Sequence, residues 1–306
     1  MTASLVMALL LCFVAAAGHA IDSPRIVVGA KKFTEGAILG ELMAQVLEQH
    51  AGAVVERRFN LAGTKVAFDA LRTGAIDAYA EYTGTGLREV LNDTEPVSGA
   101  PEAFARVSRG FDERYHLAWL APFGFNNTYV LIMRADQAQQ LKIATVSDAA
   151  TRPLRYGMSH EFLQREDGMQ GLLRVYGLHT RSVVGMEHDL AYQALAEGAI
   201  DVSDGYSTDA KIVAGKLLAL DDDKHFFPPY EAAPLVRNDL FARIPAATAA
   251  FGLLAGRIDD ATMRRLNHEV EFERREPSDV AANCLHQLGL GAAHVEASAR
   301  ERSLLA

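Results

Sequence analysis

A twelve-residue pattern that occurs twice constrains the fold of this chain more than any other feature. Residues 66–77 read VAFDALRTGAID and residues 190–201 read LAYQALAEGAID. In each copy a tyrosine follows after four further residues, Tyr82 in the first and Tyr206 in the second. Glycine after a helical segment favours the end of the helix, because it adopts the left-handed conformation at little cost. The pattern therefore predicts a helix ending near Gly74 or Gly198, and then a short strand that begins at once, over 76–79 in the first copy.

Each repeated tyrosine follows the end of a predicted strand. Ligands of α/β proteins bind at the carboxyl ends of strands. Tyr82 and Tyr206 are therefore predicted to lie at a ligand-binding edge, one in each half of the chain. The alternative is that the repeat is duplicated scaffold and that both tyrosines belong to the core.

The segments before the two copies are also alike. An apolar strand that ends in glycine (25–29, and again 154–157) is followed by a loop (31–35, and again from Ser159), an amphipathic helix (38–49, and 168–176) and a second strand (54–59, and 181–184). Thr64 is expected to cap the helix of the first copy. Alternating strands and helices are typical of an α/β fold with a mainly parallel sheet. Because 306 residues exceed one core, we predict two similar lobes.

Two turn-rich aromatic segments are the predicted crossings between the lobes, at 123–127 and 226–230. They divide the chain into a first lobe of residues 25–125 and 231–300 and a second lobe of residues 126–230, with a polar tail at 301–306. Two lobes joined by two crossings form a hinge and a cleft, an architecture that captures a solute by closing on it.

The N-terminus and the charge limit where the chain works and what it binds. Residues 5–17 are an apolar run too short to span a bilayer, and the small residues Gly18 and Ala20 follow, which predicts an export signal cleaved after Ala20. No Lys or Arg precedes the run, so an uncleaved anchor stays open as the alternative. Cleavage would leave Cys284 as the only cysteine and no intrachain disulfide, which suits a periplasmic protein. A net charge of -9 without a basic block argues against nucleic acid and anionic membranes as partners.

Four tyrosines occupy the positions that the predicted architecture directs into the cleft: Tyr82, Tyr129, Tyr206 and Tyr230. A quaternary ammonium group has no N–H to donate, and it binds to the faces of aromatic rings. Each such contact contributes about 1–2 kcal/mol, so three or four account for micromolar binding, about 8 kcal/mol. The alternative is that the four are half-buried core residues with satisfied hydroxyl groups.

Several motifs resemble one family of known proteins. They are KFTE (32–35) with ILGE (38–41), NLAGT (60–64), YAEYTGT (79–85) and NTY (127–129). The chain resembles the substrate-binding proteins of quaternary-amine ABC transporters, which capture glycine betaine, choline, carnitine and related osmoprotectants. The resemblance covers residues 26 to about 290, and YAEYTGT is its most specific motif. It implies the two-lobed type II periplasmic-binding-protein fold, delivery to an ABC permease with its cytoplasmic ATPase, and a monomer.

The resemblance also implies residue roles. The four tyrosines match the family's cage for the trimethylammonium group, and Thr85 matches a threonine that bonds the polar end of the ligand. Many members have Gln where this chain has Gly36, which offers only a backbone N–H. Lys32, Thr34 and Thr64 are the other donors expected near the polar end, with helix caps and a solvated lysine as the alternative. In the second lobe His160 and Glu161 are expected to contact the tail of a larger ligand, unless they are ordinary surface residues.

Other classes of function have less support in the sequence. His160-Glu161 lacks the second histidine of a metalloprotease, and the acidic residues around His188 at 187–189 are expected at the start of a helix. Neither a nucleophile elbow nor a glycine-rich phosphate loop occurs. We therefore expect no enzyme, metal site or cofactor. The alternatives left open are a solute-sensing receptor, or a binding protein for a bulkier betaine or a zwitterionic amino-acid derivative; the sequence does not decide which amine binds.

Overall fold

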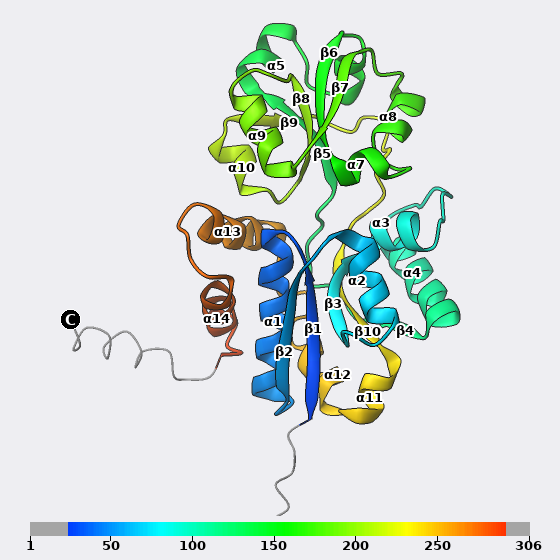
Figure 1. The fold of residues 1–306 in the computed structure, drawn as a ribbon, viewed down its shortest axis with the longest axis vertical. Helices are drawn as coiled ribbons and strands as arrows, with labels where there is room; N and C mark the ends of the chain where they lie inside the picture. Colours follow the sequence, from blue (N-terminus) through cyan, green and yellow to red (C-terminus); the bar gives the residue numbers. More distant parts are fainter. Residues whose placement is uncertain (1–23, 292–306) are drawn as a thin grey trace, which may run out of the picture.

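The computed structural model describes residues 24–291 and contains two five-stranded sheets (Figure 1). The predicted export signal and the tail at 301–306 lie outside these residues. The first lobe is built on the sheet β2-β1-β3-β10-β4, with strands Val54–Leu61, Arg25–Lys31, Ala78–Tyr82, Ala232–Arg237 and Leu117–Trp119. The second lobe is built on β7-β6-β8-β5-β9, with strands Thr180–Met186, Leu154–Ser159, Val202–Tyr206, Tyr129–Arg134 and Leu217–Ala219.

The two sheets have the same topology. β1 pairs in parallel with β2 and β3, and β6 pairs in parallel with β7 and β8. The fourth strand of each sheet, β10 or β5, is antiparallel to both of its neighbours. The expectation of an α/β fold is confirmed, and each sheet is mixed, with two parallel and two antiparallel pairings. In both lobes the reversed strand is the one that directly follows a crossing from the other lobe.

The repeated pattern forms the same local structure in both lobes. The helices are α2 (Gly63–Arg72) and α9 (His188–Ala196), and Gly74 and Gly198 follow them with φ of 78° and 71°. The strands begin later than predicted, at Ala78 and Val202. The reason is that the aspartate before each strand turns its carboxylate back to accept a backbone N–H: Asp77 from Val27 at 2.7 Å, and Asp201 from Arg155 at 2.8 Å. The repeat is therefore partly scaffold.

The other helices cover the sheets. α1 (Thr34–His50) buries most of its length in the first lobe, where α12, α13 and α14 pack against it. It begins four residues earlier than predicted, because β1 continues to Lys31 and leaves only Lys32 and Phe33 as a loop. Cys284 is buried in this core. The remaining helices are α3 (Thr83–Thr85), η1 (Gly86–Val90), α4 (Ala100–Tyr115), α5 (Ala135–Leu141), α6 (Val146–Ala150), α7 (His160–Gln164), α8 (Met169–Tyr176), α10 (Ala210–Ala214), α11 (Asn238–Arg243), α12 (Ala246–Gly252), α13 (Asp260–Glu271) and α14 (Pro277–Gln287).

The two crossings are bonded to each other. Asn126 in the first forms an antiparallel bridge with Glu231, which directly follows the second. The backbone N–H of Asn127 donates to the carbonyl of Tyr230 at 3.0 Å, and the side chain of Asn126 accepts from the N–H of Tyr230 at 2.6 Å. The two crossings are therefore joined by a short antiparallel pairing. Within residues 24–291 no helix has the length and apolar character needed to cross a bilayer.

Candidate functional site

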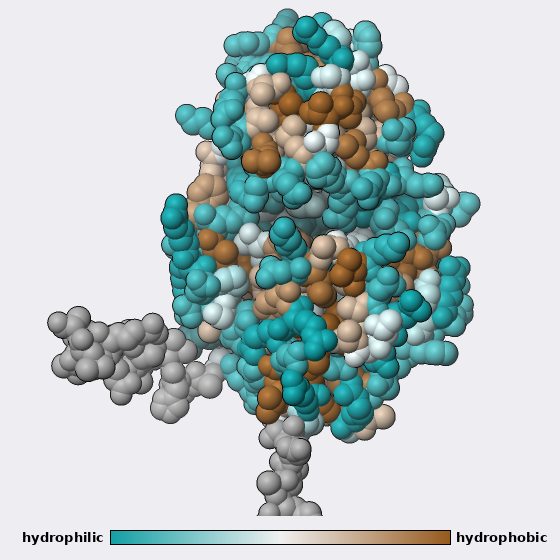
Figure 2. All heavy atoms as spheres, viewed as in Figure 1, coloured by the Kyte–Doolittle hydropathy of each residue, from teal (hydrophilic) through white to brown (hydrophobic). Residues whose placement is uncertain are grey.

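A cavity of about 740 Å³ lies between the lobes, and residues of both lobes and of both crossings line it. The face of the molecule shown in Figure 2 is mostly hydrophilic at the level between the lobes. All four predicted tyrosines line the cavity. The ring of Tyr129 lies 5.1 Å from that of Tyr206 and 5.8 Å from that of Tyr230, centroid to centroid. The predicted residues are thus brought together around one space.

Sheet geometry explains why these tyrosines meet. Tyr82 is the last residue of β3 and Tyr206 the last of β8, so both stand at the sheet edge that faces the other lobe. Tyr129 begins the reversed strand β5 and pairs directly with Tyr206, which places both side chains on the same face of the sheet. Tyr230 lies in the second crossing, and its ring packs on Gly84, where an added Cβ would come within 2.6 Å of ring carbons.

A fifth aromatic ring, Phe33, was not predicted. It lies between Tyr82 of its own lobe and Tyr206 of the second lobe, with ring centroids 6.3 and 6.0 Å apart. Its ring also covers Gly36, where an added Cβ would lie 3.0 Å from Phe33 and 2.8 Å from the carbonyl oxygen of Lys31. Gly36 is therefore buried under Phe33 and is not among the residues that line the cavity. Phe33 belongs to a motif that the sequence analysis singled out, but nothing local indicated that its ring bridges the lobes.

The predicted polar residues of the first lobe line the cavity in different ways. Thr85 and Thr64 are buried at the wall, while Lys32 is exposed at the rim. The buried lysine is instead Lys31, whose Nζ bonds Glu81 at 2.7 Å and Thr64 at 3.3 Å. The expectation that Thr64 caps α2 is wrong: the helix begins at Gly63, and the hydroxyl of Thr64 turns to the cavity.

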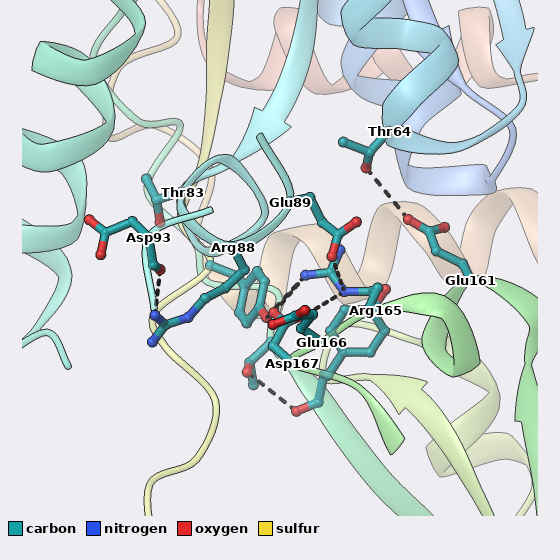
Figure 3. A network of polar contacts seen from close by, with 12 residues as sticks. Thr64, Thr83, Arg88, Glu89, Asp93, Glu161, Arg165, Glu166 and Asp167 are labelled. Carbon is teal, nitrogen blue, oxygen red and sulfur yellow. Dashed lines mark hydrogen bonds and ion pairs between the residues drawn. The ribbon is translucent and has the colours of Figure 1, made fainter. Parts of the chain in front are cut away.

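Two other predicted residues, Thr34 and His160, line the outer part of the cavity. Thr34 is half-buried at the start of α1, and His160 is exposed at the start of α7. Glu161 follows His160 and extends toward the first lobe, where the hydroxyl of Thr64 lies 3.5 Å from its carboxylate (Figure 3).

Arg165 is a second residue that the sequence analysis missed. It is 2% exposed, and its guanidinium lies 5.1 Å from the ring centre of Tyr129. Asp167 accepts from its Nε and Nη2 at 2.8 and 2.7 Å and also accepts from the hydroxyl of Tyr230 at 2.6 Å. Across the cleft, Glu89 of η1 lies 3.9 Å from Nε (Figure 3). Burial, and after it the charge of Asp167, raise the pKa of Tyr230 well above its usual value, so this phenol stays protonated.

His188 lines the cavity beside Tyr206. Its ring stacks on Tyr206 with centroids 4.8 Å apart and planes 27° apart, and its Nε2 lies 3.1 Å from Asp209. Burial alone lowers the pKa of His188, but the hydrogen bond and charge of Asp209 outweigh it, and the net direction is upward. Within residues 24–291, no three His, Cys, Asp or Glu side chains are grouped to hold a metal ion.

Residues 24–287 match the family OpuAC, described as the substrate binding domain of the ABC-type glycine betaine transport system. The chain belongs to this family. The carnitine transport binding protein OpuCC of Listeria monocytogenes is 35% identical to it over 274 residues, which cover 88% of each chain. The ergothioneine transport permease/ergothioneine binding protein EgtU of Helicobacter pylori is 34% identical over 275 residues, 89% of this chain and 49% of that protein.

A crystal structure described as a glycine betaine/carnitine/choline ABC transporter has the same fold. It superposes with a TM-score of 0.72 at 30% identity and covers 87% of this chain and 99% of its own. The type II periplasmic-binding-protein fold and the family resemblance are both confirmed. The protein is a substrate-binding protein of an ABC transporter. Its family is a transport family, not an enzyme class; members bind small quaternary amines, work with a permease and an ATPase, and act outside the cytoplasm.

Proposed function

We propose that this protein captures a quaternary ammonium compound, such as glycine betaine, choline or carnitine, and delivers it to an ABC importer. The observation that carries the proposal is the set of five aromatic rings around one interlobe cavity: Phe33, Tyr82, Tyr129, Tyr206 and Tyr230. A quaternary ammonium head is held by ring faces at about 1–2 kcal/mol per desolvated contact. Because both lobes supply rings, the closed form contacts the ligand better than the open form, which is what ligand-driven closure requires.

The polar end of the ligand is assigned to the wall opposite the rings. Thr85 and Thr64 are buried hydroxyl donors there. Such a wall suits the carboxylate of a betaine. Lys31 and Arg165 also border the cavity, but they lie over the rings of Tyr82 and Tyr129 and are paired with Glu81 and Asp167. The charge of Lys32 at the rim attracts the same anionic group at longer range, and Thr34 lies at the positive end of α1, where an anion is favoured. Gly36 plays no direct part, because Phe33 covers it.

The size of the cavity leaves room for a bulkier betaine. Small-molecule sites have volumes of about 300–1,000 Å³, and this one, at about 740 Å³, lies in the upper half of that range. His160 and Glu161 stand where the tail of a longer ligand would reach. Carnitine and ergothioneine, which the two relatives are named for, therefore belong in any ligand screen.

The place of action follows from the same proposal. A protein that hands solute to an importer works on the outer side of the cytoplasmic membrane, and the apolar run at 5–17 with cleavage near Ala20 would export it to the periplasm. A single chain supplies both walls of the cavity, so we propose that the monomer is the working form.

A calorimetric titration with matched ligands tests the proposal. Choline is compared with 3,3-dimethyl-1-butanol, which has the same shape but no charge, and glycine betaine and carnitine with dimethylglycine. Amino acids, sugars, polyamines and ergothioneine complete the panel. We expect the charged, fully methylated compounds to bind at least tenfold more tightly than their partners. Equal binding of the neutral isostere would remove the cation cage, and exclusive binding of a sugar or polyamine would overturn the ligand class.

A further inference from the structure

A buried carboxylate lies at the junction of the lobes, behind the cage. Glu35 is the second residue of α1 and is 2% exposed. Its Oε1 accepts from the hydroxyl of Tyr82 at 2.6 Å and from Nδ2 of Asn127 at 2.8 Å. Its Oε2 accepts from the hydroxyl of Thr208 at 2.6 Å and from Nδ2 of Asn267 at 3.1 Å. Few side chains in the protein receive as many donors.

These four bonds use the full capacity of the carboxylate. An ionised carboxylate offers about four lone-pair sites, two on each oxygen. Both oxygens of Glu35 therefore have all their acceptor sites occupied by protein donors, although the residue also lines the cavity. This distinguishes Glu35 from a residue that binds ligand. Burial raises the pKa of Glu35, and the hydrogen bonds from Thr208, Tyr82, Asn267 and Asn127 offset only part of that rise.

The donors come from both lobes and from the first crossing between them. Tyr82 ends β3, and Asn267 lies in α13, both in the first lobe. Asn127 lies in the first crossing. Thr208 follows β8 in the second lobe. The bond from Thr208 to Glu35 therefore joins the two lobes.

We propose that Glu35 is a positioning residue that couples the ligand cage to closure of the lobes: one carboxylate fixes the hydroxyl of Tyr82 and, in the closed form, holds Thr208 of the second lobe. The proposal deepens the proposed function and rests on it for the identity of the ligand. It gives Glu35 a share in the affinity for every ligand without a contact to any of them. A residue that stabilises only the closed form raises all affinities by one factor, because each ligand then binds a form that is more populated.

The orientation of the two asparagines supports the assignment. Asn127 and Asn267 are both buried, and both turn their amide nitrogen to Glu35. The amide oxygens of both are left without a hydrogen-bond partner among the described residues. Unpaired buried acceptors are costly. Nδ2 of Asn267 also donates to the carbonyl oxygen of Thr208 at 3.1 Å, so this amide bonds both Glu35 and the second lobe.

The test compares Thr208→Val, Glu35→Gln and the double variant with a matched control. Thr208→Val removes the interlobe donor at nearly constant shape. The control is Glu41→Gln, on the same helix, where a buried carboxylate pairs with Arg57 away from the cavity. Glycine betaine, choline and carnitine are the probes, measured by calorimetry and by stopped-flow fluorescence. Small-angle X-ray scattering of the unliganded proteins reports the opening of the lobes.

We expect Thr208→Val to weaken each probe that binds by the same factor, about tenfold, through faster dissociation. Glu35→Gln should also weaken binding. The loss of affinity in the double variant should be smaller than the product of the fold-losses in the two single variants. Glu41→Gln should leave affinity unchanged. Unchanged affinity in Thr208→Val, or factors that differ between probes as a direct ligand contact would give, overturns the proposal. If no probe binds the wild-type protein, the proposed function fails. Scattering then tests the contact between Glu35 and Thr208. A larger radius of gyration for Thr208→Val supports the proposal, and an equal one overturns it.

Discussion

Phe33 and Tyr206 face each other across the cleft with their ring centroids 6.0 Å apart, although 173 residues of chain separate them and they belong to different lobes. Phe33 packs as closely on Tyr82 of its own lobe. An apolar ring in this position excludes water from the space between two phenols without bringing a hydroxyl of its own. Shielding of this kind strengthens the attraction between a cation and the ring faces around it.

Replacement of Phe33 by Leu should therefore weaken the binding of a quaternary amine by about tenfold, since an aliphatic side chain fills part of the space but offers no ring face. Isothermal titration with choline measures the loss. Phe68→Leu is the matched control, because Phe68 packs on Phe111 and Tyr115 in the first lobe, away from the cavity. It should lower the melting temperature and leave the affinity alone. A loss of affinity in both variants would mean that Phe33 acts only through stability.

Tyr82→Ala and Tyr206→Ala should each weaken binding by about tenfold or more, from the loss of about 1–2 kcal/mol of contact with the cation. Tyr206→Phe keeps the ring and should stay within a few-fold of the wild type. Tyr82→Phe also removes a donor to Glu35 and should fall between the two. Unaltered titrations with both alanine variants would exclude the cage.

Binding should weaken as the pH falls from 8 to 6, because His188 becomes a cation stacked on Tyr206. The groups that face His188 are Asp209 and Asp204, which favour its charged form, and Lys211, which opposes it. Because the pKa of His188 is raised in the folded protein, its charged form stabilises the fold fully below about pH 6.5. This stabilisation is lost as the pH rises through the raised pKa. The same charge repels a ligand cation on the other face of the ring.

The measurement is a series of titrations with glycine betaine and with choline across this pH range. The loss should shrink in His188→Phe, which retains a ring against Tyr206 without a charge. Since choline has no carboxylate, a loss common to both ligands cannot come from titration of the ligand. A pH profile that His188→Phe leaves unaltered would exclude His188 as its source.

The repeated aspartates should contribute to stability rather than to binding. Asp201 accepts from the backbone N–H of Arg155 at 2.8 Å and from its guanidinium at 2.9 and 2.7 Å. Partial burial opposes ionisation, but Arg155 and Gln137 outweigh it and lower the pKa of Asp201. The stabilisation of the fold by ionised Asp201 is thus present above about pH 4 and is lost as the pH falls through its lowered pKa.

Asp201→Asn should cost about 2 kcal/mol of unfolding free energy at pH 7, and Asp77→Asn in the first lobe a similar amount. Urea denaturation at pH 7 measures both losses, and for Asp201→Asn the difference from the wild type should narrow near pH 3. The affinity for ligand should be unaffected. A loss of affinity with full stability would reassign the repeat to the site.

The sequence was sufficient to predict that the four tyrosines meet at one cavity, because each tyrosine stands at a position that local patterns define. Tyr82 and Tyr206 follow a helix end and a strand that the repeat marks twice, and Tyr129 and Tyr230 flank the turn-rich crossings. Such positions are set by the chain nearby, and the sheet edge brings them together.

The missed residues depend on contacts between distant segments. Asn267 is 232 residues from Glu35, and no local pattern ties the one to the other. Glu35 itself looks like an ordinary acidic residue in the first turn of a helix. Thr64 is of a residue type that often caps helices, yet it is the second residue of α2 and its hydroxyl faces Lys31 and Glu161. Which way a polar side chain turns in a cleft depends on what the opposite lobe presents, and that is fixed only by the assembled fold.

The bridge between Asn126 and Glu231 also determines how the molecule can move. Two independent tethers would let the lobes twist and slide as well as swing. Because backbone hydrogen bonds join the two crossings, they bend together as one hinge. The lobes can then rotate about little more than a single axis, so every solute that enters meets the same two closing surfaces.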